Sequence, residues 1–174
     1  MKYRWLPAPA QPQLASQLAA ELGLSPLLAQ CLLNRGLLQP AAIRDFLEPR
    51  LKHLADPFLL PNMEVGSERL LRAGQAGEAL VIFGDYDVDG VTSTALLHQV
   101  LGQLGWQVRS FLPDRLGEGY GLTREALEHC LERTPATLLL AVDCGSNALD
   151  TITWLQQRGL DGLVPAHHQV CAPA

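Results

Sequence analysis

The stretch that most constrains the fold runs from Leu80 to Thr94 and reads LVIFGDYDVDGVTST. Its apolar beginning is short, continuous and partly β-branched, which is typical of a buried strand. Gly84 ends this run, and three aspartates then follow at alternate positions: Asp85, Asp87 and Asp89. Gly90 closes the acidic loop, and the pattern predicts a helix over residues 91–104. The stretch therefore predicts a strand, an acidic loop and a helix in that order.

The acidic loop needs a positive charge. Three carboxylates within five residues repel one another unless a cation lies among them. Hard oxygen ligands suit Mg²⁺, Mn²⁺ or Ca²⁺. The loop therefore predicts a divalent-cation site at the end of a strand.

The second part of the chain alternates between strand and helix patterns. Such alternation is typical of an α/β fold, with a parallel sheet, flanking helices and right-handed crossovers. The predicted strands cover residues 79–83, 107–112, 137–142 and 161–164, and the predicted helices cover residues 91–104, 123–133 and 147–158.

The first part of the chain shows helix patterns only. Ser25 followed by Pro26 is a helix start, with serine as the N-cap. Three prolines in residues 48–62 favour an extended connector. We expect a helical N-terminal lobe with its connector over residues 1–62, and an α/β domain over residues 63–174. The predicted helices cover residues 13–22, 26–35, 40–47 and 65–76.

Polar residues follow each predicted strand. Ligands of open α/β sheets bind beyond the carboxyl ends of the strands. Carboxylates and imidazoles suit cations, and an arginine suits phosphate charge, so this convergence predicts a metal-assisted phosphoryl site. Beyond the aspartates of the first strand, the residues in question are Arg115, Asp143, His167 and His168.

Composition indicates a globular protein away from membranes. The chain is 48% hydrophobic and 18% charged, and no apolar run reaches the roughly 18 residues that cross a bilayer. The N-terminus lacks the apolar region of a secretory signal, so a cytoplasmic location is expected. The four cysteines are far apart and predict reduced thiols. A zinc site of Cys171 with His167 or His168 has little support.

Charge is unevenly distributed along the chain. Residues 1–76 carry 8 basic and 6 acidic side chains, whereas residues 77–174 carry 5 basic and 12 acidic ones. Two divalent ions would offset part of that negative charge, so a phosphate substrate is not excluded. No broad basic face is expected to hold nucleic acid through counterion release.

Two other classes of acidic loop share part of this pattern. An EF-hand loop needs a bidentate glutamate at its twelfth position, where this chain has Leu96, and a helix where this chain has a strand. A haloacid-dehalogenase-type phosphatase also places DxDG after its first strand. It uses a downstream lysine, whereas the lysines here, Lys2 and Lys52, lie upstream. This phosphatase stays open as an alternative.

Four segments together resemble the DHH phosphoesterases: GDYDVDGVTSTALL (84–97), FLPDRLGEGYGLT (111–123), LLLAVDCGSNA (138–148) and LVPAHHQ (163–169). The EGYGL element and the layout of the N-terminal part narrow the resemblance to the RecJ family of 5′→3′ exonucleases specific for single-stranded DNA. The resemblance covers essentially the whole chain. It implies a DHH-type α/β domain, here incomplete, and roles in DNA repair and recombination.

The resemblance also implies a role for each candidate residue. Two Mn²⁺ or Mg²⁺ ions would be bound by Asp85, Asp87, Asp89, Asp143 and His167. Asp143, His167 and His168 would be the catalytic residues, with His168 on the phosphate side. Arg115 and Tyr120 would bind the substrate phosphate. The implied reaction is two-metal hydrolysis of a phosphodiester at the 5′ end of the strand.

The chain departs from the family pattern in two places. Ala166 stands where the family has the aspartate that precedes the two histidines. In the family, a further metal-binding aspartate, a second substrate-binding domain and an oligonucleotide-binding fold lie beyond the point matching residue 174. We therefore expect weak or no activity from this chain alone, and tight binding of single-stranded DNA only with those domains. A non-catalytic remnant serving as an interaction or metal-binding module, and a relative acting on short oligonucleotides or cyclic dinucleotides, remain alternatives.

Overall fold

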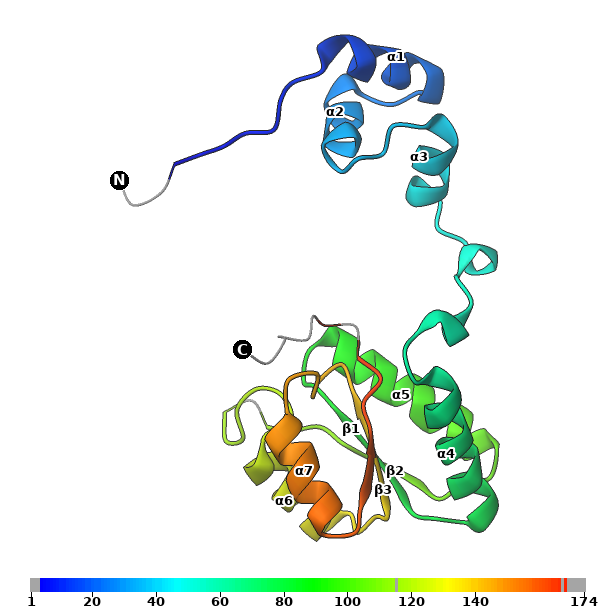
Figure 1. The fold of residues 1–174 in the computed structure, drawn as a ribbon, viewed down its shortest axis with the longest axis vertical. Helices are drawn as coiled ribbons and strands as arrows, with labels where there is room; N and C mark the ends of the chain where they lie inside the picture. Colours follow the sequence, from blue (N-terminus) through cyan, green and yellow to red (C-terminus); the bar gives the residue numbers. More distant parts are fainter. Residues whose placement is uncertain (1–3, 115, 167, 169–174) are drawn as a thin grey trace. The chain divides into compact units, whose positions relative to one another are not determined.

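The structure is a computed structural model that describes residues 4–114, 116–166 and 168. The chain divides into two compact units, Met1–Leu59 and Leu60–Ala174. Figure 1 shows helices alone in the first unit and a sheet with helices in the second.

The first unit is a small helical lobe. Its helices enclose an apolar core that includes Leu32 and the fully buried Ile43. Each helix has a proline in its first turn, and the Ser25 hydroxyl accepts a hydrogen bond from the backbone N–H of Leu28 at 3.2 Å. The predicted helices are confirmed as α1 (Pro12–Leu22), α2 (Pro26–Asn34) and α3 (Pro40–Leu47).

The connector differs from its prediction as an extended segment. It contains two short 3₁₀ helices, η1 (Leu51–His53) and η2 (Pro57–Leu59). The carboxylate of Asp56 accepts a hydrogen bond from the backbone N–H of Phe58 at 2.9 Å, which stabilises the second turn. Proline disfavours a long helix here but fits the first position of a short turn.

The second unit contains a parallel sheet of four strands in the order β2-β1-β3-β4. This confirms the predicted α/β class and the parallel sheet with flanking helices. The strands are β1 (Leu80–Gly84), β2 (Val108–Phe111), β3 (Leu138–Val142) and β4 (Asp161–Leu163). The helices are α4 (Met63–Ala76), α5 (Val88–Gln103), α6 (Arg124–Arg133) and α7 (Leu149–Gln157).

The two faces of the sheet form two apolar layers. Alternate side chains of a strand point to opposite faces, so Val81 and Phe83 pack with residues of α6 and α7. Leu80 and Ile82 pack on the other face with residues of α4 and α5. Figure 1 shows these two helix pairs on opposite sides of the sheet. Both central strands, β1 and β3, are buried along their whole length, which explains their continuous apolar sequences.

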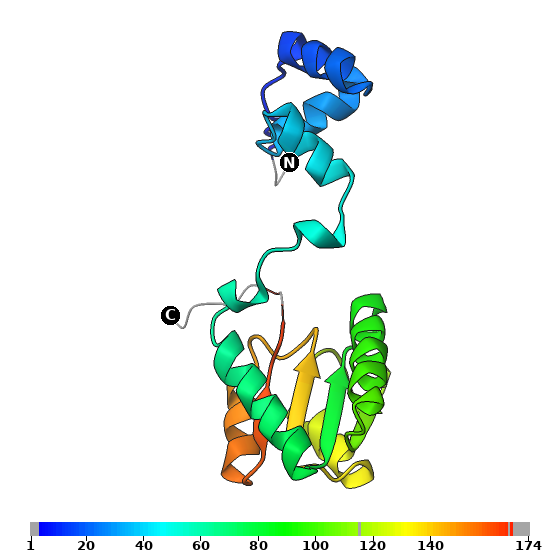
Figure 2. The same ribbon diagram turned by 90° about the vertical axis from the view of Figure 1, so that its right-hand side faces the viewer.

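The pairing of β1 with β3 fixes the position of the acidic residues. The two strands run parallel, and Gly84 is the register partner of Val142. Asp85 and Asp143 are the next residues, so both follow neighbouring strand ends at the same edge of the sheet. Figure 2 shows the arrowheads of these two strands side by side.

Two glycines allow α5 to begin against the end of β1. A Cβ at Gly90 would lie 2.3 Å from the carbonyl oxygen of Asp85, and one at Gly84 would lie 2.1 Å from the Thr94 hydroxyl. Both distances are too short for a real side chain, so these positions require glycine. The predicted start of this helix at residue 91 was wrong, because α5 begins at Val88.

An ion-pair network ties α4 to the edge strand β4. The Arg69 guanidinium contacts the Glu78 carboxylate at 2.9 Å and the Asp161 carboxylate at 2.6 Å. Hydrogen bonding to Glu78, followed by that to Asp161, raises the pKa of Arg69, and the guanidinium lowers the pKa of Glu78. The network holds the start of the strand that leads to His168.

We expect Gly90→Ala to lower the free energy of unfolding by about 1–3 kcal/mol, because the added methyl group would push α5 away from Asp85. Gly102→Ala is the matched control in the same helix, where a Cβ would meet nothing within 4 Å. It should raise the free energy of unfolding by up to about 1 kcal/mol. Urea unfolding followed by circular dichroism measures both. Equal effects of the two changes would contradict a close contact at Gly90.

Candidate active site

Asp85 is a fully buried carboxylate at the end of β1, with 0% of its surface exposed. Its Oδ1 atom accepts a hydrogen bond from the backbone N–H of Tyr86 at 2.7 Å. Its Oδ2 atom is buried and has no hydrogen-bond partner among the described residues. An incompletely satisfied buried carboxylate is costly, and such exceptions call for an explanation such as a bound ion.

Asp87 is the N-cap of α5. Its Oδ1 atom accepts a hydrogen bond from the backbone N–H of Gly90 at 3.0 Å. This hydrogen bond lowers the pKa of Asp87, with further contributions from the neighbouring Asp143 and His168 side chains. The carboxylate thus remains ionised beside the positive end of a helix.

Asp143 follows β3 in a strained backbone conformation. Its φ of 59° lies in the left-handed region, which non-glycine residues rarely adopt. The residue is 6% exposed. Its Oδ1 atom lies 3.6 Å from Nε2 of His168. Strain of this kind costs about 1–3 kcal/mol and clusters at functional sites.

Asp89 differs from Asp85 and Asp87 in its side-chain hydrogen bonds. It is exposed in the first turn of α5, as Asp87 is at the N-cap. The structure shows no hydrogen bond or ion pair of its carboxylate with any described residue, although its backbone helps to lower the pKa of Asp87. That all three aspartates of this stretch share a metal site stays a prediction.

Tyr120, in the loop after β2, lies beside the acidic residues that follow β1. Its ring meets the Tyr86 ring edge-on, with 5.8 Å between the centroids. The negative charge of Asp85 raises the pKa of Tyr120 most, followed by partial burial and by the closeness of the Asp85 side chain to the phenol, and the charges of Asp87 and Asp143 contribute less. A protonated phenol near three carboxylates can donate a hydrogen bond to a substrate oxygen.

Glu118 organises this loop and was not among the predicted site residues. Its carboxylate accepts a hydrogen bond from the backbone N–H of Asp114 at 2.6 Å and contacts Nδ1 of His129. Partial burial opposes ionisation, but these hydrogen bonds lower the pKa of Glu118. Its place within the EGYGL element was the available sequence signal. Arg115 and His167, both predicted site residues, lie outside the described residues.

The site fits a hard cation by the chemistry of its donors. Within the described residues, no three His, Cys, Asp or Glu side chains already lie close enough together to hold a metal ion. The fit rests instead on the unsatisfied buried oxygen of Asp85, with the carboxylates of Asp87 and Asp143 beside it. Oxygen donors of this kind suit Mg²⁺ and Mn²⁺.

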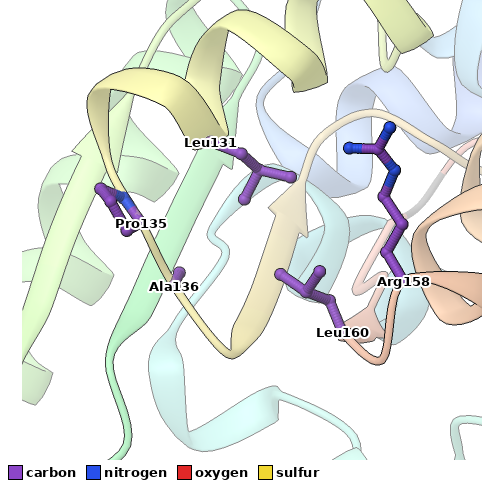
Figure 3. Close-up of a pocket in the computed structure, with 5 residues that line it drawn as sticks. All are labelled: Leu131, Pro135, Ala136, Arg158 and Leu160. Carbon is purple, nitrogen blue, oxygen red and sulfur yellow. The ribbon is translucent and has the colours of Figure 1, made fainter.

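Two hollows lie at opposite ends of the sheet. One is a cleft of about 570 Å³ beside Asp143 and His168. The other, of about 480 Å³, is shown in Figure 3 and lies before the amino ends of β3 and β4. Apart from Arg158, its lining is apolar: Leu131, Pro135, Ala136 and Leu160. The cleft beside the carboxylates is therefore the candidate binding site.

Two further observations concern the helices and the cysteines. No helix in the described part of the chain is long and apolar enough to span a membrane. Three cysteines within the described ranges, Cys31, Cys130 and Cys144, are free thiols. Burial raises the pKa of both Cys130 and Cys144 to about 12, so neither is a reactive thiolate.

The chain is similar to known proteins over nearly its whole length. It is 35% identical to the single-stranded-DNA-specific exonuclease RecJ of Bacillus subtilis over 169 residues, which is 97% of this chain and 21% of that protein. The fold is similar to a crystal structure of exonuclease RecJ bound to manganese, with a TM-score of 0.60 and 36% identity over 69% of this chain and 30% of that one. RecJ from Thermus thermophilus in complex with Mn²⁺ gives a TM-score of 0.64 at 27% identity, over 94% of this chain and 22% of that one.

The chain spans about a fifth of the length of the first curated relatives that it matches. Residues 79–174 match the family model described as the DHH family, N-terminal domain. This match favours the DHH phosphoesterases over the dehalogenase-type phosphatases. The chain therefore belongs to the DHH family, and its relatives within that family are RecJ exonucleases.

Proposed function

We propose that this chain forms the metal-binding core of a RecJ-type phosphodiesterase that hydrolyses single-stranded DNA from its 5′ end. The observation that carries the proposal is the placement of two buried carboxylates, Asp85 and Asp143, at neighbouring strand ends. Its relative from Bacillus subtilis is a single-stranded-DNA-specific exonuclease, which supports single-stranded DNA as the substrate and phosphodiester hydrolysis as the reaction. Solved relatives with manganese support the choice of Mn²⁺ or Mg²⁺ as the cofactor.

The proposed metal ligands are the residues predicted from the sequence: Asp85, Asp87, Asp89, Asp143 and His167. Two divalent cations bound there would neutralise the phosphate charge and lower the pKa of water. Asp85 fits this role best, because a cation would satisfy its buried oxygen. Asp89 would have to reorient from its exposed position, or bind through water.

The other residues would position and polarise the substrate. The Asp143 carboxylate lies 3.6 Å from Nε2 of His168 and would orient this ring. That orientation allows His168 to act on the phosphate side. The Tyr120 hydroxyl stays protonated beside the acidic residues and can donate a hydrogen bond to a phosphate oxygen. Arg115 would supply the positive charge that the phosphate requires.

The charge of this region limits how it holds DNA. Residues 77–174 carry 12 acidic and 5 basic side chains, so bound cations must offset the repulsion between this unit and a phosphodiester chain. We infer weak binding of single-stranded DNA by this chain alone and tighter binding only with additional nucleic-acid-binding modules. We also propose a cytoplasmic role in DNA repair and recombination. The chain is proposed to consist of two domains whose boundary in the sequence lies at residue 62.

A second candidate function is a non-catalytic module that binds metal or a partner protein. Ala166 favours it, because the family pattern has an aspartate at this position. A carboxylate that supports a metal-binding histidine usually contributes 10–100-fold to metal affinity or activity. Its loss can leave a folded site with little turnover.

Asp85→Asn tests the metal site. Without metal, we expect this variant to be more stable than the wild type, because it removes a buried negative charge beside Asp87 and Asp143. With millimolar Mn²⁺, the melting temperature of the wild type should rise and that of the variant should not. Glu132→Gln, at an exposed carboxylate on α6, is the control and should behave like the wild type. An equal Mn²⁺ response of Asp85→Asn and wild type would contradict the proposed site.

Asp87 separates helix capping from metal binding. Asparagine caps a helix as well as aspartate does, so Asp87→Asn should keep the stability of the metal-free protein but lose Mn²⁺ affinity. Asp87→Ala should lose both, because the hydrogen bond to Gly90 N–H disappears. Urea unfolding and calorimetric titration with Mn²⁺ measure the two effects. Undiminished Mn²⁺ affinity of Asp87→Asn would show that Asp87 only caps the helix.

Ala166→Asp decides between the two candidate functions. It should raise the rate of Mn²⁺-dependent mononucleotide release from 5′-labelled single-stranded DNA by about 10–100-fold. Ala166→Asn has a similar size without the charge and serves as the control. Equal rates for the two variants would rule out a missing carboxylate. No release by any form, with Mn²⁺ still bound, would favour the non-catalytic module.

A further inference from the structure

The loop between β2 and α6 carries Tyr120, and the conformation of this loop decides where the phenol lies. Gly119 and Gly121 flank the tyrosine, and both have a φ of 80°, in the left-handed region that favours glycine. After the second glycine, Leu122 is 5% exposed and packs in the apolar core. Tyr120 itself is 62% exposed, so its own packing fixes it weakly. Its position therefore depends on what holds the segment before Gly119.

Glu118 is the polar anchor of that segment. Its carboxylate accepts a hydrogen bond from the backbone N–H of Asp114 at 2.6 Å, and its own N–H donates to the Asp114 carbonyl oxygen at 2.9 Å. Its carbonyl oxygen accepts a hydrogen bond from the Thr123 hydroxyl at 3.5 Å. The side chain of Glu118 is only 14% exposed. A carboxylate so far removed from water needs a charged or hydrogen-bonding partner to stay in place.

His129, on α6, provides that partner. Its Nδ1 atom contacts the carboxylate of Glu118. Its ring meets the ring of Phe111 edge-on, with 5.6 Å between the centroids. Phe111 ends β2 and is 7% exposed, so it belongs to the rigid core. The imidazole is thus held between the sheet and the loop, and the Glu118 carboxylate that contacts it is held as well.

This pair acts on the candidate active site through the loop rather than by contact. In the described part of the chain, the side chains of Glu118 and His129 have no hydrogen bond or ion pair with the acidic residues that follow β1 and β3. Two residues after Glu118, however, the Tyr120 ring meets the Tyr86 ring edge-on beside those acidic residues. A displacement of Glu118 would therefore move the phenol, with one glycine between the two side chains.

We propose that His129 is a positioning residue, which acts through Glu118 to hold the Tyr120 phenol beside the acidic residues. The inference rests on the proposed function, in which Tyr120 binds the substrate phosphate, and adds a residue of α6 that lies outside the strand ends. Without the imidazole, Glu118 would be a partly buried carboxylate that has lost its side-chain partner, and it would turn towards water. The segment before Gly119 would follow, and Tyr120 would leave Tyr86.

Fluorine NMR of protein labelled with meta-fluorotyrosine follows Tyr120 without metal or substrate. The chain has three tyrosines, and Tyr120→Phe identifies the signal. His129→Leu keeps an apolar contact with Phe111 but removes Nδ1, so it should shift the Tyr120 signal towards its value in urea-unfolded protein. His129→Asn should retain most of the wild-type shift, because its amide nitrogen can replace Nδ1. His98→Leu, at an exposed histidine on α5, is the matched control and should leave the signal unchanged.

Calorimetric titration with thymidine 5′-monophosphate in the presence of Mn²⁺ measures the effect on a phosphate ligand. His129→Leu should weaken its binding about threefold to tenfold. In a double-mutant cycle, His129→Leu should cause no further loss in a Tyr120→Phe background, because both changes remove the same interaction.

Two outcomes would overturn the assignment: additive losses in the cycle, or an unmoved Tyr120 signal in folded His129→Leu. Circular dichroism reports folding, and His129→Ala takes the place of His129→Leu if the leucine disrupts it. A wild type that binds neither Mn²⁺ nor the nucleotide would refute the proposed function instead, and the fluorine signal would still show whether His129 positions Tyr120.

Discussion

The parallel pairing of β1 with β3 is the interaction on which the site depends. It places Asp85 and Asp143 at adjacent strand ends, although 57 residues separate them in the sequence. Two buried carboxylates so close repel each other, and the positive φ of Asp143 adds strain. The apolar layers on both faces of these strands offset that cost. The sheet thus holds together a group of charges that would separate in a less constrained chain.

The close contact between α5 and the end of β1 is the second feature that holds the acidic residues in place. Glycine at position 90 lets the helix start against the Asp85 backbone. The first-turn N–H groups then face the acidic residues, and Asp87 accepts one of them. The helix end therefore compensates part of the negative charge, while the unsatisfied oxygen of Asp85 is left for a cation. One residue, Asp87, thus caps this helix and is also a proposed metal ligand.

The local sequence predicted the elements of the fold well and their long-range relations only in part. Continuous apolar runs located β1 and β3 to within one residue, because both strands are buried on two faces. The start of α5 was predicted too late in the sequence because Gly90 was interpreted as a loop residue. In the structure Gly90 lies within the helix, where the absence of a side chain allows close contact with the Asp85 backbone. The strand order and the pairing of Arg69 with Asp161 could not be predicted, because no local pattern records a contact between residues so far apart in the chain. The convergence at the strand ends was predictable, whereas the different environments of Asp85 and Asp89 depend on side-chain packing.

With alanine at position 166, Asp143 is the carboxylate that would serve both the His168 ring and the proposed metal ions. The His168 ring lies 3.6 Å from this carboxylate, which is also a proposed metal ligand. A carboxylate that binds two cations has less negative charge to offer an imidazole, and a carboxylate turned towards the imidazole presents fewer oxygens to metal. An aspartate at position 166 would provide a second acidic group near the histidines, so that each carboxylate could serve one partner. If Asp143 binds metal as proposed, the alanine would leave it with competing tasks, and this competition is a physical reason to expect weak catalysis from a chain with an intact first motif.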